Sequence, residues 1–317
     1  MKGASSKVAE DPQAKIDQPP VFETIQRIPD LVPNNQKVRM ENIKALGLER
    51  YIVELDTLGY TVVPPGVGCS EEEVKNISDA VLRILEKRTG TKHSVDENGK
   101  PGSYADGLGA HNQFQLYYML LADRACENWL DNKVLRAIID YALRGQAQLC
   151  SMVSFVKWRD GGYGNKLGLH TDSQGGSPEG VLTLSHQCAC NVALALTPYT
   201  KEDGALAVVP GSHLYYRQPR YEEGASDAVP IIAPVGSMIF WVGNLWHGAY
   251  PKMTDGLRLN LTGNFNNRAF KTLENYGRHV PLDVLRRHDM WFARTLGADE
   301  VYGWGEEGPQ PPLIESI

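Results

Sequence analysis

The sequence predicts a mainly β fold with flanking helices, and two observations support this class. From residue 149 onward, short apolar runs of strand length alternate with polar or glycine-containing turns. Before residue 149, apolar residues instead recur at helical spacing in several segments. The helices are therefore expected to brace one face of a β core. The main apolar runs of that core are residues 191–196, 205–213, 236–242 and 256–262.

The N-terminal part combines a tail with helices. Residues 1–34 are polar and contain prolines, which is typical of a mobile tail. Residues 46–58 have helical spacing and lead into a first strand at 59–63. Ser70, which three glutamates follow, is typical of a capped helix start, and residues 128–144 repeat the helical pattern. The apolar stripe of the helix that begins after Ser70 consists of Val74, Ile77, Val81, Ile84 and Leu85.

Residues 35–317 are expected to form a single domain, because a chain of 317 residues can bury one large core and no internal repeat divides it. Near the C-terminus, residues 281–296 are predicted to form a helix with Pro281 in its first turn. Three roles are open for the segment 281–317. It can pack against the core, cover a site or build a homodimer contact.

Charge and cysteine content limit the partners and the compartment. The net charge is −6 and the pI about 5.8, without a long basic block, so nucleic acid and anionic membrane are not expected as partners. Five scattered cysteines favour free thiols in a reducing compartment. No run reaches the roughly 18 apolar residues of a membrane span, and residues 1–18 do not resemble a secretory signal. We therefore expect a cytoplasmic protein.

Two histidines and an aspartate have the composition of a metal site. Side chains at i and i+2 of an extended segment lie on the same face, so His170 and Asp172 can bind one metal ion together. His247 follows a later apolar strand. Two imidazoles and one carboxylate are the ligand set of a non-haem Fe(II) centre with open coordination positions. Arg258, eleven residues beyond His247, offers a planar fork that matches a carboxylate.

The remaining histidines have structural interpretations. His213 follows Pro-Gly-Ser at a turn and is expected to hydrogen-bond the loop. His186 lies near Cys188 and Cys190, which suggests zinc, but two thiols one residue apart do not match the two spaced ligand pairs of a zinc site. Both cysteines are therefore interpreted as core or pocket-wall residues.

The succession of strands and ligands resembles the phytanoyl-CoA dioxygenase family of Fe(II)/2-oxoglutarate-dependent oxygenases over about residues 45–270. Its most specific parts are the run Asp203-Gly-Ala-Leu-Ala-Val-Val-Pro-Gly-Ser-His213 and the spacing from His247 to Arg258. The resemblance implies His170, Asp172 and His247 as the catalytic iron ligands. It also implies that Arg258 binds the distal carboxylate of 2-oxoglutarate. The expected architecture is a double-stranded β-helix, a cupin-like jelly roll with the iron near its open end.

The chemistry that the resemblance implies consumes O₂ and 2-oxoglutarate, releases succinate and CO₂, and hydroxylates or otherwise oxidises an unactivated C–H bond of a small molecule. A coenzyme A thioester is not favoured, because its phosphates would require a basic cluster. The preferred substrate is a secondary metabolite or an amino-acid derivative.

The chain departs from the family at two positions beside the expected site. Ala193 and Ala249 stand where many relatives carry Trp and Ser. Further contacts to 2-oxoglutarate are therefore expected from Asn191, Gln148 and Thr262. The N-terminal region lines the substrate pocket in the family. The expected substrate contacts are His111, Asn112, Gln113, Phe114 and, beside a ligand, Trp246.

Two alternatives belong to other functional classes. One is a jelly-roll protein that binds a metal or a sugar without catalysis, in which Arg258 forms a salt bridge. The other is a zinc- or manganese-dependent cupin-type hydrolase or isomerase. Such a site would recruit a further histidine, with His186 or His213 turned inward.

Overall fold

A six-stranded antiparallel sheet is the largest element of the fold, with strand order β1-β7-β4-β9-β3-β2. A computed structural model describes residues 36–97, 113–160, 166–172, 187–300, 304–306, 308–309 and 311–316. The strands of the large sheet are β1 (Tyr60–Val63), β2 (Gln113–Leu116), β3 (Ala147–Lys157), β4 (Ala189–Ala195), β7 (Met238–Val242) and β9 (Asn260–Asn267).

A second, three-stranded sheet has the order β6-β5-β8. A bridge between His170 and His247 adds one more segment beside β8. Two antiparallel sheets with helices on the outside confirm the mainly β class. The smaller strands are β5 (Leu206–Val208), β6 (Val229–Pro230), β8 (His247–Ala249) and, in a separate ladder, β10 (Trp304–Gly305) and β11 (Gly308–Pro309).

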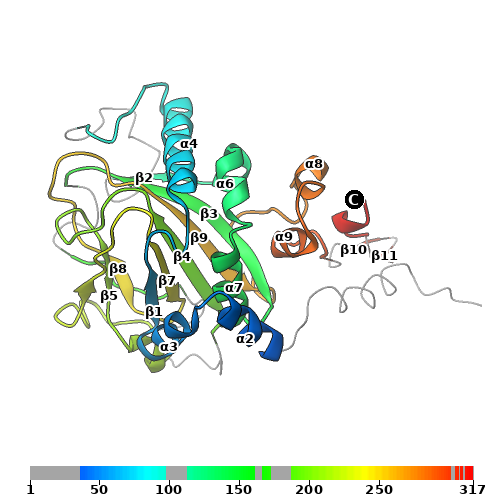
Figure 1. Cartoon of the computed structure of the whole chain (residues 1–317), viewed down its shortest axis with the longest axis horizontal. Coiled ribbons are helices and arrows are strands. Elements are labelled where there is room, and N and C mark those ends of the chain that lie inside the picture. Colours follow the sequence, from blue (N-terminus) through cyan, green and yellow to red (C-terminus); the bar gives the residue numbers. More distant parts are fainter. Residues whose placement is uncertain are drawn as a thin grey trace, which may run out of the picture.

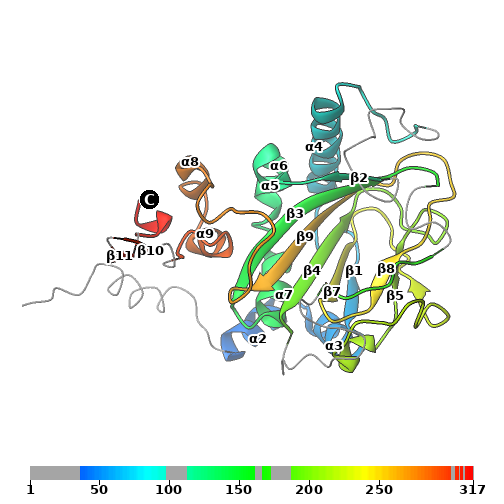
Figure 2. The same cartoon turned by 180° about the vertical axis from the view of Figure 1, so that it is seen from behind.

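Figures 1 and 2, seen from opposite sides, show helices α4, α6 and α7 on one face of the large sheet. The strands β5 and β8 lie at the opposite end of the molecule from helices α8 and α9. The helices are α2 (Gln36–Ala45), α3 (Glu49–Leu58), α4 (Glu71–Thr89), α5 (Met119–Ala122), α6 (Arg124–Trp129), α7 (Lys133–Ala142), α8 (Leu282–Leu285) and α9 (Met290–Thr295), with 3₁₀ turns at Ser212–Tyr215 and Leu313–Ser316.

Helix α4 forms as its sequence predicts. The Ser70 side chain accepts a hydrogen bond from the Glu73 N–H, and the Glu73 carboxylate in turn accepts one from the Ser70 N–H. Gly90, in the left-handed conformation, ends the helix. The predicted apolar stripe is buried at each of its positions, Val74, Ile77, Val81, Ile84 and Leu85.

Two predicted helices are interrupted. The segment 128–144 divides because the Asn132 side chain accepts hydrogen bonds from the N–H groups of Val134 and Leu135 and starts α7. The segment 281–296 divides in the same way, since Asp289 caps α9. Helix α2 was not predicted at all, and Gly47, in the left-handed conformation, separates it from α3. The predicted tail 1–34 lies outside the described residues.

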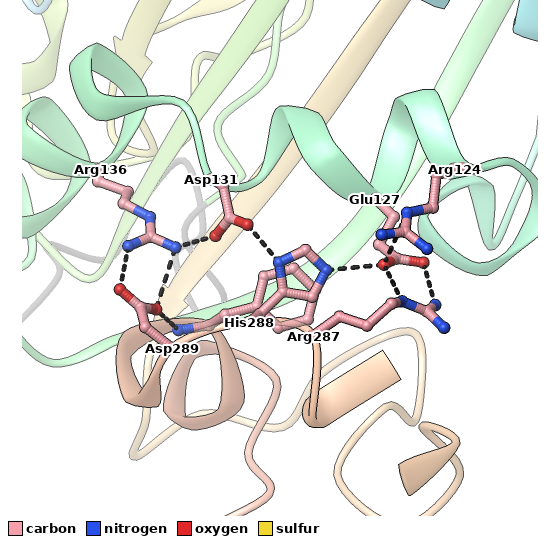
Figure 3. Close-up of polar contacts among 8 residues, drawn as sticks. Arg124, Glu127, Asp131, Arg136, Arg287, His288 and Asp289 are labelled. Atoms are coloured by element: carbon pink, nitrogen blue, oxygen red, sulfur yellow. Dashed lines mark hydrogen bonds and ion pairs between the residues drawn. The ribbon is translucent and has the colours of Figure 1, made fainter. Parts of the chain in front are cut away.

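The C-terminal segment packs against the core helices through a polar network (Figure 3). His288 lies between two carboxylates: its Nδ1 contacts Asp131, and its Nε2 lies 2.7 Å from Oε1 of Glu127. Arg287 donates to the other Glu127 oxygen at 2.8 Å. Packing against the core is therefore one role of this segment, whereas the homodimer contact stays a prediction. In the part of the chain that the model describes, no helix is long and apolar enough to cross a membrane.

Candidate metal centre

The two histidines of the predicted ligand set are direct cross-strand partners. The N–H of His170 donates to the carbonyl of His247 at 2.9 Å, and the reverse bond has the same length. A further bond, from the Ala249 N–H to the Leu167 carbonyl at 2.9 Å, extends this pairing. The two imidazole centroids lie 4.4 Å apart, so the second sheet itself holds the rings side by side.

Asp172 completes the group from just beyond the bridged segment. Its N–H donates to the Gly243 carbonyl at 2.9 Å, which ties it to the turn after β7. One carboxylate oxygen lies 3.6 Å from Nε2 of His170 and the other 3.2 Å from Nε2 of His247. One ligand atom from each of the three residues lies within 4.8 Å of the others. This arrangement can hold one metal ion.

The histidine tautomers fit such an ion. Nδ1 of His170 lies 2.8 Å from the Gly168 carbonyl, and Nδ1 of His247 lies 2.9 Å from the Leu245 carbonyl. A carbonyl oxygen only accepts, so both Nδ1 atoms carry the proton and both Nε2 lone pairs face Asp172. The donor set that remains, two neutral imidazoles and a carboxylate, suits Fe(II).

The carboxylate of Asp172 is kept ionised. Desolvation raises its pKa. When the imidazoles are protonated, as they can be without a metal ion, the charge of His247 and hydrogen bonds donated from Nε2 of both rings outweigh this and hold the pKa of Asp172 well below its usual range. Desolvation lowers the pKa of His170, and Asp172 raises it by more. Asn191 also donates from Nδ2 to the Asp172 carboxylate at 2.6 Å. Asn191 therefore orients a ligand in addition to lining the pocket.

Gln218 holds the short segment between His170 and Asp172 in place. Its amide oxygen accepts from the Thr171 N–H at 2.9 Å, and its amide nitrogen donates to the Thr171 carbonyl at 3.1 Å. The side chain thus replaces a neighbouring strand at the residue between His170 and Asp172. The sequence offers no signal for this contact, because the two residues are 47 positions apart.

Replacing Gln218 with leucine is expected to weaken metal binding by about 10- to 100-fold, the usual effect of losing a group that orients metal ligands. Leucine has a similar size but bonds neither backbone group of Thr171. Metal affinity, measured by calorimetric titration of the apoprotein with Fe(II) under nitrogen, checks this. Gln115→Leu, which also removes an amide but leaves the Thr171 contact in place, is the control. Equal affinities for the two variants would refute the role of Gln218.

A pocket of about 350 Å³ lies over the candidate metal centre. Alternate residues of β3 and β9 line it, because side chains on a strand alternate between the faces of the sheet. Neighbouring strands contribute the rest of the floor. The lining residues include Ser151, Val153, Phe155 and Lys157 from β3, Asn260, Thr262, Asn264 and Asn266 from β9, Asn191 and Ala193 from β4, Gln113 and Gln115 from β2, and Trp241 from β7.

Arg258 lines the same pocket and is 5% exposed. Its Nη1 donates to the Tyr199 hydroxyl at 3.1 Å, and the guanidinium lies 5.0 Å from the centre of the Tyr199 ring. Nε is buried without a hydrogen-bond partner, and no described carboxylate forms an ion pair with the guanidinium. Burying an unpaired charge is costly, so this end of the pocket is suited to an anion.

The sequence was compared with models of known protein families. A family model described as phytanoyl-CoA dioxygenase matches residues 55–260, about two thirds of the chain. The chain belongs to the phytanoyl-CoA dioxygenase family. This membership confirms the resemblance inferred from the strand order and the ligand spacing.

Individual relatives match only part of their length. An uncharacterised protein of Mycobacterium tuberculosis, Rv1501, is 32% identical over 130 residues, which cover 38% of this chain and 45% of the relative. Dioxygenase andF of Emericella variicolor is 30% identical over 109 residues (34% and 37%). Multifunctional dioxygenase prhA of Penicillium brasilianum is 28% identical over 138 residues (38% and 46%). The chain thus spans less than half the length of each of these relatives.

Solved structures support the fold. HygX from Streptomyces hygroscopicus, with nickel and 2-oxoglutarate bound, has a TM-score of 0.54 at 16% identity, covering 71% of this chain and 89% of that chain. EctD from S. alaskensis, in its apoform, has a TM-score of 0.54 at 18% identity (74% and 81%). The similarity to these two solved folds confirms the predicted jelly-roll core.

Of the other predicted site residues, some line the pocket and others lie away from it. Asn191, Thr262 and Gln113 line the pocket. Gln148 does not: it lies beyond the β-bulge between Leu149 and Ser151, and a Cβ on Gly297 would lie 2.3 Å from its Nε2. The register across the bulge pairs Gln148 with Asn266, which does line the pocket, so Gln148 is on the pocket side of the sheet. Its side chain lies beside Gly297 instead, beyond the lining residues.

Two of the expected substrate contacts also lie away from the pocket. Phe114 is fully buried and packs edge-on against Trp158, with the ring centroids 5.2 Å apart. Side chains on β2 point alternately to the two faces of the sheet, so Phe114 faces away from the pocket that Gln113 and Gln115 line. Trp246 is 1% exposed, and its indole N–H donates to the Arg217 carbonyl at 2.8 Å. His111 and Asn112 lie outside the described residues.

His213 is used structurally, as expected. Its Nε2 lies 3.1 Å from the Asp56 carbonyl, and burial lowers its pKa. Cys188 and Cys190 are buried without a disulfide, in keeping with wall or core roles, and His186 lies outside the described residues.

Several lining residues escaped sequence analysis. Trp241 was interpreted as core, yet it faces the pocket with its ring 5.5 Å from that of His247. Lys157 and Tyr199 were not singled out. One signal was present for β9, where polar residues recur at every second position from 260 to 266. In a sheet, this spacing indicates a polar face.

Proposed function

We propose that this protein is an Fe(II)- and 2-oxoglutarate-dependent dioxygenase that hydroxylates or otherwise oxidises a C–H bond of a small molecule. One observation carries the proposal. The Nε2 atoms of His170 and His247 lie beside the carboxylate of Asp172, and the same pocket is also lined by the cationic side chain of Arg258. The fold alone does not need Arg258 there, since its charge is buried without an anionic partner among the described residues.

The residues of the pocket divide the work. His170, Asp172 and His247 would occupy three positions of the metal and leave the others for co-substrate and O₂. When bound, ferrous iron supplies the O₂ activation that couples decarboxylation of 2-oxoglutarate, to succinate and CO₂, with oxidation of the substrate. Arg258 would bind the distal carboxylate and set the direction of the co-substrate. The pocket would then decide which C–H bond lies nearest to the metal.

The substrate we propose is a secondary metabolite or an amino-acid-type molecule. Away from Arg258, the described lining combines amide and hydroxyl side chains with apolar ones, as in Asn264, Ser151 and Trp241. Such a surface suits a small, oxygen-containing molecule. Relatives named dioxygenases from fungi and the carbocyclase SnoK from nogalamycin biosynthesis agree with this class.

The rival metal-dependent cupin is less well supported. It would recruit a further histidine, His186 or His213, turned inward. His213 bonds the backbone of Asp56 instead, and His186 lies outside the described residues. A non-catalytic role would pair Arg258 with a carboxylate, and no described residue supplies one. Five buried cysteines that form no disulfide suit the reducing, cytoplasmic location that we also propose.

The test is an anaerobic titration of the Fe(II)-loaded protein with 2-oxoglutarate. We expect the weak visible charge-transfer band of a chelated keto acid, with an apparent affinity that falls about 10- to 100-fold in Arg258→Met, since a charged hydrogen bond is lost. Arg159→Met, which removes a half-exposed arginine that pairs with Asp255, is the control. Absence of the band in folded, iron-loaded wild type would refute the proposed function.

A further inference from the structure

A second buried cation lies beside Arg258. Lys157 ends strand β3, is 1% exposed and lines the pocket. Its backbone pairs with that of Arg258 in both directions, at 2.7 and 3.0 Å. Directly paired residues project their side chains to the same face of a sheet. The sheet therefore presents two cations together at this end of the pocket.

Both side chains flank Gly204. Nη1 of Arg258 lies 3.4 Å from the Gly204 carbonyl, and a Cβ on Gly204 would lie 3.1 Å from Cδ of Lys157. Gly204 has a φ of +77°, so a side chain there would be strained as well as crowded. The absence of a side chain leaves the two cations room to lie next to each other.

Lys157 has no anionic partner among the described residues. Its ammonium donates to the Tyr250 carbonyl at 3.2 Å. The nearby carboxylate of Asp203 instead lies 3.5 Å from Nζ of Lys252, which the hydroxyl of Thr254 also contacts at 2.6 Å. Burial, and then the charges of Arg258 and Lys252, hold the pKa of Lys157 well below its usual value. Without a ligand this lowering favours the neutral amine, and an anion bound beside Lys157 would restore its positive charge.

We propose that Lys157 is a second binding residue for the distal carboxylate of the co-substrate, which it and Arg258 hold from two sides. The inference rests on the proposed function and adds a determinant of co-substrate choice to it. Two cations with no described carboxylate between them favour a 2-oxo acid that carries a second carboxylate over one that ends in a methyl group. Lys157 thereby acts in selectivity as well as in affinity.

The experiment compares 2-oxoglutarate with 2-oxopentanoate, which has a methyl group in place of the distal carboxylate. Both are titrated calorimetrically into Ni(II)-loaded wild type and Lys157→Met, so that no turnover intervenes. We expect the variant to bind 2-oxoglutarate about 10- to 100-fold more weakly, as for loss of one charged hydrogen bond. Its affinity for 2-oxopentanoate should stay close to that of wild type.

Lys252→Met is the matched control. Lys252 is also a buried lysine, 2% exposed, but its charge is compensated by Asp203 and it does not line the pocket. It should retain 2-oxoglutarate selectivity. Thermal unfolding of each variant verifies the fold, and methionine preserves most of the lysine volume.

The outcomes separate the two claims. Wild type that binds neither keto acid would overturn the proposed function. Wild type that binds 2-oxoglutarate, together with a Lys157→Met variant of unchanged affinity, would overturn only the role of Lys157. An equal loss for both keto acids would also overturn it, because the distal carboxylate would then not be the group that Lys157 contacts.

Discussion

Replacing His247 with alanine is expected to abolish Fe(II) binding and turnover. The change removes one of the three proposed ligands, and the remaining His170 and Asp172 cannot enclose the ion. The loss should exceed the about 10- to 100-fold that follows removal of a group behind a ligand. Iron content after anaerobic reconstitution and succinate production from 2-oxoglutarate are the two measurements.

His213→Ala is the control for this prediction. His213 is a buried histidine too, but it hydrogen-bonds the Asp56 backbone and is not one of the three proposed ligands. Its loss should lower thermal stability while the iron stoichiometry stays that of wild type. Full iron content and activity in His247→Ala would remove that residue from the site.

Replacing Gly248 with alanine is expected to disrupt the same centre through the backbone. A Cβ at this position would lie 2.1 Å from the carbonyl oxygen and 3.0 Å from the carbonyl carbon of Leu167. These atoms belong to the chain that leads into His170, so the two segments must separate. The pairing of His170 with His247 depends on this close approach. We expect a loss of about 1–3 kcal/mol in the free energy of unfolding, as for other overpacked sites, together with weaker iron binding.

Gly68→Ala is the control, because its added Cβ would collide with a side chain and not with the backbone. A Cβ on Gly68 would lie 2.6 Å from Sδ of Met238, which is a flexible side chain that can move aside. Chemical denaturation and iron titration of both variants give the comparison. If Gly248→Ala matched Gly68→Ala in stability and iron affinity, the strand beside His247 would be more adaptable than this geometry implies.

Helix α4 shows how far local signals reach. Ser70 and Glu73, three residues apart, form a capping box at the start of the helix. The apolar residues of its buried face follow one another every three or four positions. Its start and its buried face could therefore be predicted from the sequence. The breaks after Trp129 and before Met290 could not, because the helical apolar pattern continues through them. Only the caps at Asn132 and Asp289 end the regular hydrogen bonding there.

In the candidate site, too, some residues could be predicted from the sequence and others only from the tertiary structure. The sequence alone predicted His170, Asp172, His247 and Arg258 from residue type, the i, i+2 spacing of the first two and the spacing from His247 to Arg258, and the structure brings all four to one pocket. The tertiary structure was needed to exclude Gln148 from the pocket lining and to find Gln218 and Lys157. Those contacts depend on the register between strands and on how the chain after α9, at Gly297, packs against β3. They join residues that are far apart along the chain, where no local pattern records which side chains will meet.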